Sequence, residues 1–541
     1  MDQAGKLTRA FTVIRTIQIA TFIAIFSYLI GACLRQGPLW DDGYYPMQFN
    51  EQLSNLRVGL WRREIPFGDG YGLGGFTILN IASKIFRLDF TLNARADFTG
   101  LLERRYVLVV LTMVGAVVLE RLSLRLGMSQ FEAIIASILL VLTPNWIGQG
   151  TINVKDVPVA VGLLLIANSS IRLLESPISE VRFGGISFLF EFVLGVMLSF
   201  GTRFGLFPFI LVVNCCVVGI LVWKRKVDKS WTNLIFLIFG NVISYILLVP
   251  FNPTLWDPFR MMQRSVTGSL SLFNQSAGPV LTAGRLIDGM NPPWWYLPSW
   301  TIAQFPASYV CFLLVGLFTA IAKLSQKQEH RNFRDAFNFQ RYPNFPKWAI
   351  FCSLTVMPYI AAVILRPPLY DGDRQFIMAY PLLILIIVKT TSSFIKAINL
   401  RPLMISIFVL ILVISPGVAL WQSYPFPYAF RNELILHPER DWEGDYMGVS
   451  LREGASRISA SNPLSYDFSD ERWLASENID VVGSNIRIPT EGPMFIGTRR
   501  GARISLPREC INVDAVTIRP WWREVVLSFV ASCREIDLRD E

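Results

Sequence analysis

Eleven long apolar stretches constrain the fold of this chain more than any other feature of its sequence. A helix needs about 17 to 25 mainly apolar residues to cross a hydrocarbon layer about 30 Å thick. Stretches of about this length lie near residues 11–34, 105–121, 131–148, 157–172, 184–201, 204–222, 232–251, 301–322, 348–365, 377–392 and 402–421. They predict a polytopic α-helical membrane protein with about eleven transmembrane helices.

The composition agrees with a membrane location for most of the chain. Of the 541 residues, 52% are hydrophobic and 17% are charged, whereas a globular protein has about 25% charged residues. A water-soluble chain of this size would leave large apolar patches exposed. The net charge of +9 does not indicate a nucleic-acid partner, because residues 1–421 carry 36 Lys and Arg against 22 Asp and Glu, while residues 422–541 carry 14 Arg against 19 acidic residues. A basic membrane part is what the positive-inside rule requires.

The loops between the stretches set the orientation, because Lys and Arg in short loops favour the cytoplasmic side. With the N-terminus in the cytoplasm, the basic loops share one side and the long first loop 35–104 lies on the other. The odd number of spans then makes the C-terminal segment extracytoplasmic. We therefore expect a transmembrane domain over residues 1–421 and a small extracytoplasmic α/β domain over residues 422–541.

Two cysteines fall in that outer segment, Cys510 and Cys533. The other five lie in predicted spans, where cysteine commonly acts as a small apolar residue. Two cysteines in an oxidising compartment could pair, so Cys510 and Cys533 are a candidate disulfide, with two free thiols as the alternative.

Polar residues inside the predicted spans are scarce. Glu191 is the clearest charge within a span, and both Glu191 and Asn241 are most simply read as interhelical hydrogen-bonding groups. A transporter would need ionisable groups near the bilayer midplane. The unusual polar residues gather instead at the outer ends of the spans, which favours a site at the outer boundary between membrane and water.

The first polar patch follows the first span directly. It contains Asp41 and Asp42 beside Tyr44 and Tyr45. Two acids on an outer loop are usually solvated charge, and on that reading they do nothing. Beside aromatic residues at the interface a carboxylate is partly desolvated and becomes more basic, so this pair is also a candidate catalytic base.

Two further patches lie in short connections between predicted spans. One is the outer turn between the third and fourth spans, and the other is the connection between the fifth and sixth. The turn contains Asn153, Lys155 and Asp156, in which Lys155 would face an anion while Asp156 holds it or an acceptor; the simpler reading is an interfacial ion pair. Arg203 stands between two apolar spans, where an arginine is costly unless it meets an anion or reaches a lipid head group.

The fourth patch precedes the tenth span and contains Tyr370, Asp371 and Arg374. The planar guanidinium of Arg374 suits a phosphate or a carboxylate, and Asp371 or Asp373 could orient it. An aromatic stretch, Trp294 to Tyr296 with Trp295 between them, lies in another outer loop. It would line a substrate mouth or form an ordinary interfacial aromatic belt.

Taken together in this order, the motifs resemble those of the GT-C glycosyltransferases, in particular the bacterial relatives of protein O-mannosyltransferases and of the lipid A aminoarabinose transferase. The resemblance covers most of the chain. The motifs are Asp41-Asp42, Asn153-x-Lys155-Asp156-x-Pro158, Thr202-Arg203, Asn291 to Tyr296, Tyr370 to Phe376 and Asp445 to Ser450. At Met447 and Gln375 such relatives commonly have Trp and His, which leaves the subtype open.

The resemblance implies an enzyme of the bacterial cytoplasmic (inner) membrane that moves a sugar from a polyprenyl phosphate to a hydroxyl acceptor, with inversion, on the outer face. The acceptor would be an envelope glycan, a lipid or a protein. Asp41 or Asp42 would be the base, with Asp156 also in the catalytic set, and Lys155, Arg203 and Arg374 would meet the donor phosphate. The substrate-binding site would be lined by Tyr44, Tyr45, Asn153, Tyr370, Asp371 and the 294–296 stretch.

No cofactor is required by this chemistry, because fixed cations can meet the charge of a monophosphate leaving group. The only two histidines, His330 and His437, are far apart in the sequence, so no His-rich or Cys-rich metal cluster is indicated. A divalent ion held by carboxylates stays open. Two other classes of function also stay open: a transporter of lipid-linked sugar or polysaccharide, and a non-catalytic assembly subunit that binds glycan.

Overall fold

The computed structural model describes the greater part of the transmembrane region and parts of the C-terminal segment. The residues described are 3–37, 46, 49–51, 54, 72, 74–87, 101–175, 184–228, 231–251, 279–326, 344–398, 402–446, 448–456, 464–466, 494–498, 510–520 and 523–533. The statements below concern these residues.

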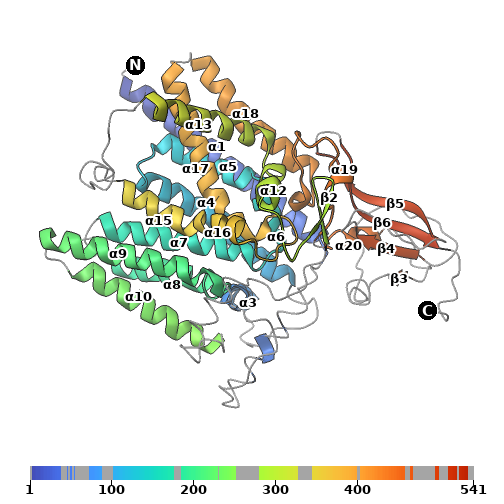
Figure 1. The fold of residues 1–541 in the computed structure, drawn as a ribbon, viewed down its shortest axis with the longest axis horizontal. Helices are drawn as coiled ribbons and strands as arrows, with labels where there is room; N and C mark the ends of the chain where they lie inside the picture. Colours follow the sequence, from blue (N-terminus) through green and yellow to red (C-terminus); the bar gives the residue numbers. More distant parts are fainter. Residues whose placement is uncertain are drawn as a thin grey trace.

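A bundle of helices makes up most of the structure, and a small sheet lies at one end of it (Figure 1). The first helices are α1 (Gln3–Arg35), α3 (Gly74–Arg87), α4 (Leu101–Arg125), α5 (Gln130–Leu142), α6 (Pro144–Ile152), α7 (Asp156–Glu175), α8 (Gly184–Leu198), η2 (Phe204–Leu206), α9 (Phe207–Asp228), α10 (Thr232–Leu248) and η3 (Val249–Phe251). The later ones are α12 (Tyr296–Gln304), α13 (Ala307–Gln326), α15 (Phe345–Thr355), α16 (Met357–Leu365), η5 (Arg374–Ala379), α17 (Tyr380–Ile398), α18 (Pro402–Gln422), η6 (Pro427–Ala429), α19 (Pro438–Asp441) and α20 (Leu451–Ser456).

The apolar helices confirm the prediction of a helical membrane protein. Five helices among the described residues are long and apolar enough to span a membrane, and the number rises to eight if each of three bent helix pairs counts as one span. Three shorter apolar helices account for the other predicted stretches: Gly184–Leu198, Thr232–Leu248 and Ile407–Gln422. The count of eleven spans stays a prediction.

Helix α7 lies at the centre of the bundle, packed against α4, α8 and α15. In the apolar 18-residue window of α7, 94% is buried. Glycines permit part of this packing: a Cβ on Gly162 would lie 2.6 Å from the carbonyl oxygen of Gly195 on α8. Small residues at such positions let helices approach closely inside a membrane. The N-terminus of α7 carries Asp156, so central packing fixes the position of that acid.

Three pairs of apolar helices are joined by a sharp bend, and a proline lies at each bend. The bends are 60° between α5 and α6, 119° between α12 and α13, and 45° between α15 and α16. Pro144 opens α6, Pro306 precedes α13 and Pro358 lies in the first turn of α16. Proline has no N–H to donate and is tolerated in a first turn, so it ends one helix and begins the next.

The C-terminal segment forms a four-stranded sheet in the order β3-β4-β6-β5, with β3 parallel to β4 and the other pairs antiparallel. The strands are β3 (Leu464–Tyr466), β4 (Met494–Thr498), β5 (Cys510–Ile518) and β6 (Val525–Cys533). Apolar residues of β5 and β6 share a small core with Ile152 of α6 and with Phe426, Tyr428, Ala429, Tyr446 and Val449. The sheet therefore sits at the end of the bundle where α6 ends and α7 begins.

The strand register places Cys510 directly opposite Cys533. Directly opposed residues of an antiparallel pair have Cα atoms about 4.5 to 5.5 Å apart, within the range that a disulfide requires. The register is therefore compatible with the disulfide, which stays a prediction.

Candidate functional site

An ion cluster forms around Asp156 at the beginning of α7. Arg203, which comes between α8 and η2, donates from Nη2 to Oδ1 of Asp156. Nη1 of Arg374 lies 3.6 Å from Oδ2 of the same carboxylate, and Nη2 of Arg374 lies 2.8 Å from Oδ2 of Asp371. All four side chains are buried. Three chain segments that are distant in the sequence thus meet at one end of the bundle.

Asn153 builds the local structure that presents Asp156. Its Oδ1 accepts from the backbone N–H groups of Lys155 at 3.0 Å and Asp156 at 2.9 Å, as asparagine does where a turn leads into a helix. Its Nδ2 donates to Oδ2 of Asp156 at 2.7 Å. An acid at a helix N-terminus is also favoured by the helix dipole. Lys155 is half-exposed beside this turn.

A turn of left-handed residues presents Arg374. The backbone φ angles of Asp371 and Gly372 are 59° and 72°, a region that non-glycine residues seldom occupy. The hydroxyl of Tyr296 donates to the Gly372 carbonyl at 3.3 Å, and the Arg374 guanidinium lies over the Tyr370 ring, 5.5 Å from its centre. A Cβ on Gly372 would lie 3.1 Å from Trp300. The turn is therefore held on several sides, and Arg374 is held with it.

The cluster is suited to binding an anion. A guanidinium carries five N–H donors, so an arginine can hold a carboxylate and another acceptor at the same time. Asp156 and Asp371 balance the charges of Arg203 and Arg374, and Lys155 precedes Asp156 in the turn that Asn153 holds. Fixed cations in a buried site stabilise developing negative charge more strongly than the same groups in water.

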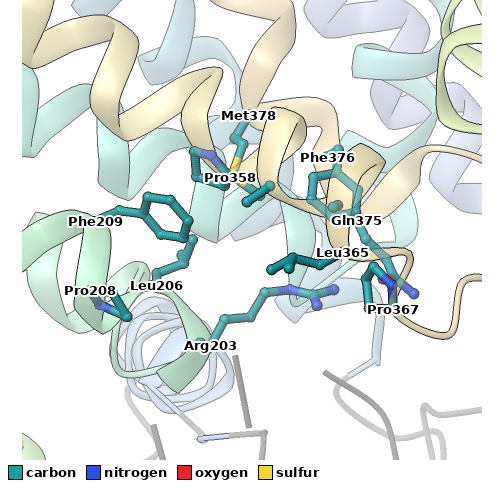
Figure 2. A pocket seen from close by; sticks show the side chains of 13 residues that line it. Arg203, Leu206, Pro208, Phe209, Pro358, Leu365, Pro367, Gln375, Phe376 and Met378 are labelled. Carbon is teal, nitrogen blue, oxygen red and sulfur yellow. The ribbon is translucent and has the colours of Figure 1, made fainter. Parts of the chain in front are cut away.

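An apolar cavity of about 210 Å³ adjoins the cluster. It lies between the beginning of α9 and the end of α16, and Figure 2 shows the Arg203 guanidinium and the Gln375 side chain near Pro367, with Phe209 and Met378 farther along the cavity. Among the described residues that line it, Arg203 is the only charged one. One arginine therefore belongs to both the ion cluster and the cavity wall.

A second buried network centres on Asp373, which the sequence indicated only as a partner for Arg374. Its Oδ2 accepts from the hydroxyls of Tyr380 at 2.8 Å and Thr301 at 2.9 Å, and its Oδ1 accepts from Nδ2 of Asn145 at 3.0 Å. Asn145 also donates to Oε1 of Gln304 at 2.8 Å. These contacts fasten the turn before Arg374 to α6, α12 and α17.

Hydrogen-bonded amide side chains connect Asp373 with Asp156. Gln149 donates to Oδ1 of Asn145 at 3.4 Å, and Oε1 of Gln149 accepts from Asn153 at 2.8 Å. Asn153 in turn contacts Asp156. Sequence reasoning missed Asn145 and Gln149, although two amides one helical turn apart within an apolar stretch, just after Pro144, are a readable signal.

The segment after the last span closes the far side of this network. The guanidinium of Arg431 lies 4.5 Å from the centre of the Trp300 ring and donates to the Glu443 carbonyl at 2.7 Å. Asp445 accepts from the Tyr428 hydroxyl at 2.5 Å and from the backbone of Ser450 at 2.8 Å. Tyr428, Arg431 and Asp445 therefore belong to the support of the site.

The carboxyl of Asp373 gives stability a specific pH dependence. It lies just before the candidate span, and burial raises its pKa from 3.8 to about 6, opposed by hydrogen bonds from Tyr380 and Thr301 and by the charge of Arg431. The pKa of Asp373 is higher in the folded state than in the unfolded state, so the folded state is favoured while the carboxyl is protonated. This contribution to the free energy of unfolding is fully present below about pH 4 and is lost as the pH rises through about 6. The total loss is about 3 kcal/mol. Asp373→Asn removes this titration.

We expect the unfolding midpoint of the wild type to fall relative to that of Asp373→Asn between about pH 4 and about pH 7. Thermal unfolding in lipid nanodiscs measures both curves. Asp288→Asn, at an exposed position on β2 (Arg285–Asp288), is the matched control and should run parallel to the wild type. Parallel curves for Asp373→Asn and the wild type would show that Asp373 does not titrate in this way.

The predicted site residues fall into three groups. The structure brings together Asn153, Asp156, Arg203, Asp371 and Arg374, with Tyr370 and Tyr296 beside Arg374. Lys155 is at the edge, Trp295 packs against the core, and Trp294 is 59% exposed, so the 294–296 stretch does not act as one surface.

Asp41, Asp42, Tyr44 and Tyr45 lie outside the described residues. Gly37, shortly before them in the sequence, is held at this end of the bundle, where its N–H donates to Val449 at 2.8 Å. The chemical roles assigned to all of these residues stay predictions. In the described part of the chain, no group of three or more His, Cys, Asp or Glu is placed to hold a metal ion.

Comparison with known proteins adds no assignment. No protein-family model matches the chain, and no curated protein matches it in sequence.

Proposed function

We propose that this protein is a membrane glycosyltransferase of the GT-C type that transfers a sugar from a polyprenyl phosphate to a hydroxyl acceptor. The observation that carries the proposal is the meeting of Arg203, Arg374 and Asp156 in a buried cluster that shares Arg203 with an apolar cavity. A ligand with an anionic head group and an apolar chain fits this arrangement, with its head group at the ion cluster and its chain in the cavity.

The same proposal includes the membrane arrangement expected from the sequence. Eleven spans would place the N-terminus in the cytoplasm of a bacterium and the cluster, the cavity and the C-terminal α/β domain at the outer face of its inner membrane. A polyprenyl chain is retained in the bilayer by about 0.8 kcal/mol per buried CH₂. The donor would therefore reach the cavity sideways, from the lipid.

In the proposed reaction, a carboxylate of Asp41 or Asp42 takes the proton of the acceptor hydroxyl. The acceptor oxygen forms a bond to the anomeric carbon, and the bond from that carbon to the phosphate oxygen breaks. The electron pair of the broken bond stays on the polyprenyl phosphate, where Arg203, Arg374 and Lys155 would meet the added charge. Asp156 would hold the two guanidiniums in place.

A lipid-linked sugar transporter is the second candidate, because the three bent spans resemble the interrupted helices of transporters. The polar residues within the predicted spans give the transporter function little support. Glu191 accepts from Asn168 on the neighbouring helix α7 at 2.8 Å, and Asn241 on α10 accepts from Asn214 on α9 at 3.1 Å. Both are interhelical contacts of an ordinary kind.

Release of free polyprenyl phosphate separates the two functions. Envelope membranes that contain the protein would be incubated and their lipids followed by mass spectrometry, with Asp41→Asn/Asp42→Asn as the matched variant. We expect the wild type to release polyprenyl phosphate and the double variant to release at least about a hundredfold less. Movement of intact lipid-linked sugar between leaflets without release would favour the transporter, and undiminished release by the variant would reject the base assignment.

A further inference from the structure

Gln375 is a buried amide whose hydrogen-bonding groups are unused. It follows Arg374 in η5, its side chain is 4% exposed, and within the described part of the chain neither Oε1 nor Nε2 has a hydrogen-bond partner. Buried polar atoms are nearly always paired, because leaving one unpaired costs the loss of its hydration. An amide that the described residues leave without a partner has both atoms available to a ligand in the adjoining cavity.

The surroundings of Gln375 define the chemistry of that partner. Gln375 lines the apolar cavity together with Arg203, and Figure 2 shows both side chains near Pro367, with the other labelled side chains of the wall apolar or aromatic. A wholly apolar ligand would leave the amide unpaired, and a wholly polar one would leave the rest of the cavity without an apolar partner. The ligand must carry an apolar chain and a polar, anionic end.

The cavity favours one chain rather than two. Its volume of about 210 Å³ is below the range of about 300 to 1,000 Å³ that is usual for drug-sized ligands. On the two helices that line it, Leu211 of α9 and Ile364 of α16 are exposed apolar residues, at 46% and 70%. In a membrane, a single chain would enter the cavity across these apolar helix surfaces.

We propose that Gln375 recognises the head group of a single-chain lipid monophosphate whose chain occupies this cavity. Nε2 donates to a phosphate oxygen beside Arg203, and Oε1 accepts from a hydroxyl of the group that the phosphate carries. Gln375 is thus a specificity-determining residue that separates lipid phosphates from neutral lipid alcohols. The proposal rests on the proposed function, because it assigns one contact within the same donor site.

Binding of farnesyl phosphate to the full chain in phosphatidylcholine nanodiscs tests the proposal. Gln375→Leu keeps the size of the side chain and removes the donor, so we expect it to weaken farnesyl phosphate binding about tenfold or more. Farnesol, which lacks the phosphate, should bind wild type and variant alike. Thermal unfolding is the control: because the described residues give the amide no partner, Gln375→Leu should not lower the unfolding midpoint, whereas a structural role would.

The outcomes separate this inference from the proposed function. If the wild type binds farnesyl phosphate and Gln375→Leu binds it equally well, the role of Gln375 is wrong while the donor class stands. Equal weakening for farnesol would also overturn it, because packing would then explain the effect. Equal binding of dioleoyl phosphatidic acid would overturn the single-chain assignment. A wild type that binds no lipid phosphate would reject both the inference and the donor class.

Discussion

Arg374→Gln should lower release of polyprenyl phosphate at least about a hundredfold, the loss that follows removal of one fixed donor to a developing anion. Arg374 contacts Asp156 at 3.6 Å and Asp371 at 2.8 Å, so the substitution removes a cation and also loosens both acids. The rate of release in envelope membranes, measured by mass spectrometry, gives the effect directly.

Two comparisons make this prediction specific. Arg374→Lys keeps the charge but lacks the planar fork, so it should recover only a small part of the rate. Arg519→Gln changes an arginine with a 73% exposed side chain just after β5 and should keep the wild-type rate. Full activity of Arg374→Gln would remove the phosphate role from this residue.

Asp156→Ala should have the largest effect on stability. It leaves the buried Arg203 without the carboxylate that it contacts, and breaking a buried ion pair from one side costs about 3 to 5 kcal/mol. Transfer should also fall, because both guanidiniums lose their common anchor. Thermal unfolding in nanodiscs and the release assay measure the two effects separately.

The double variant Asp156→Ala/Arg203→Met supplies the control for Asp156. Removing both charges relieves the uncompensated arginine, so the double variant should unfold closer to the wild-type midpoint than Asp156→Ala alone. Transfer should not return with the stability, since Arg203 is needed at the donor site. Arg203→Met alone completes the comparison. If the loss of stability in the double variant equals the sum of the losses in Asp156→Ala and Arg203→Met, Asp156 and Arg203 do not form the pair described here.

The sequence supplied the helical membrane fold because long apolar stretches have few other structures available to them. It also indicated the polar patches that converge, because in a polytopic bundle every second loop lies at the same end. Asp156, Arg203 and Arg374 were predictable in this way, and the structure adds their mutual contacts. The binding roles given to them are still predictions.

Other parts of the site depend on tertiary packing that no local pattern encodes. The sequence indicated Asp373 only as a residue that orients Arg374. In the structure it accepts hydrogen bonds from side chains of α6, α12 and α17. The bend at Pro144 turns α6 so that Asn145 reaches Asp373, a distance of 228 residues along the chain. The sequence marked Gln375 only as a departure from the His common in similar proteins, because only the structure shows that its amide is unpaired among the described residues and lines the cavity.

The most direct test of the account is to identify the lipid that the protein retains when it is purified gently from its own membrane. Native mass spectrometry should find a lipid-linked sugar monophosphate bound to the wild type, and much less of it on Arg374→Gln. If both proteins instead carry the same ordinary diacyl phospholipids and no phosphate-linked sugar, the ion cluster and its cavity are not a donor site.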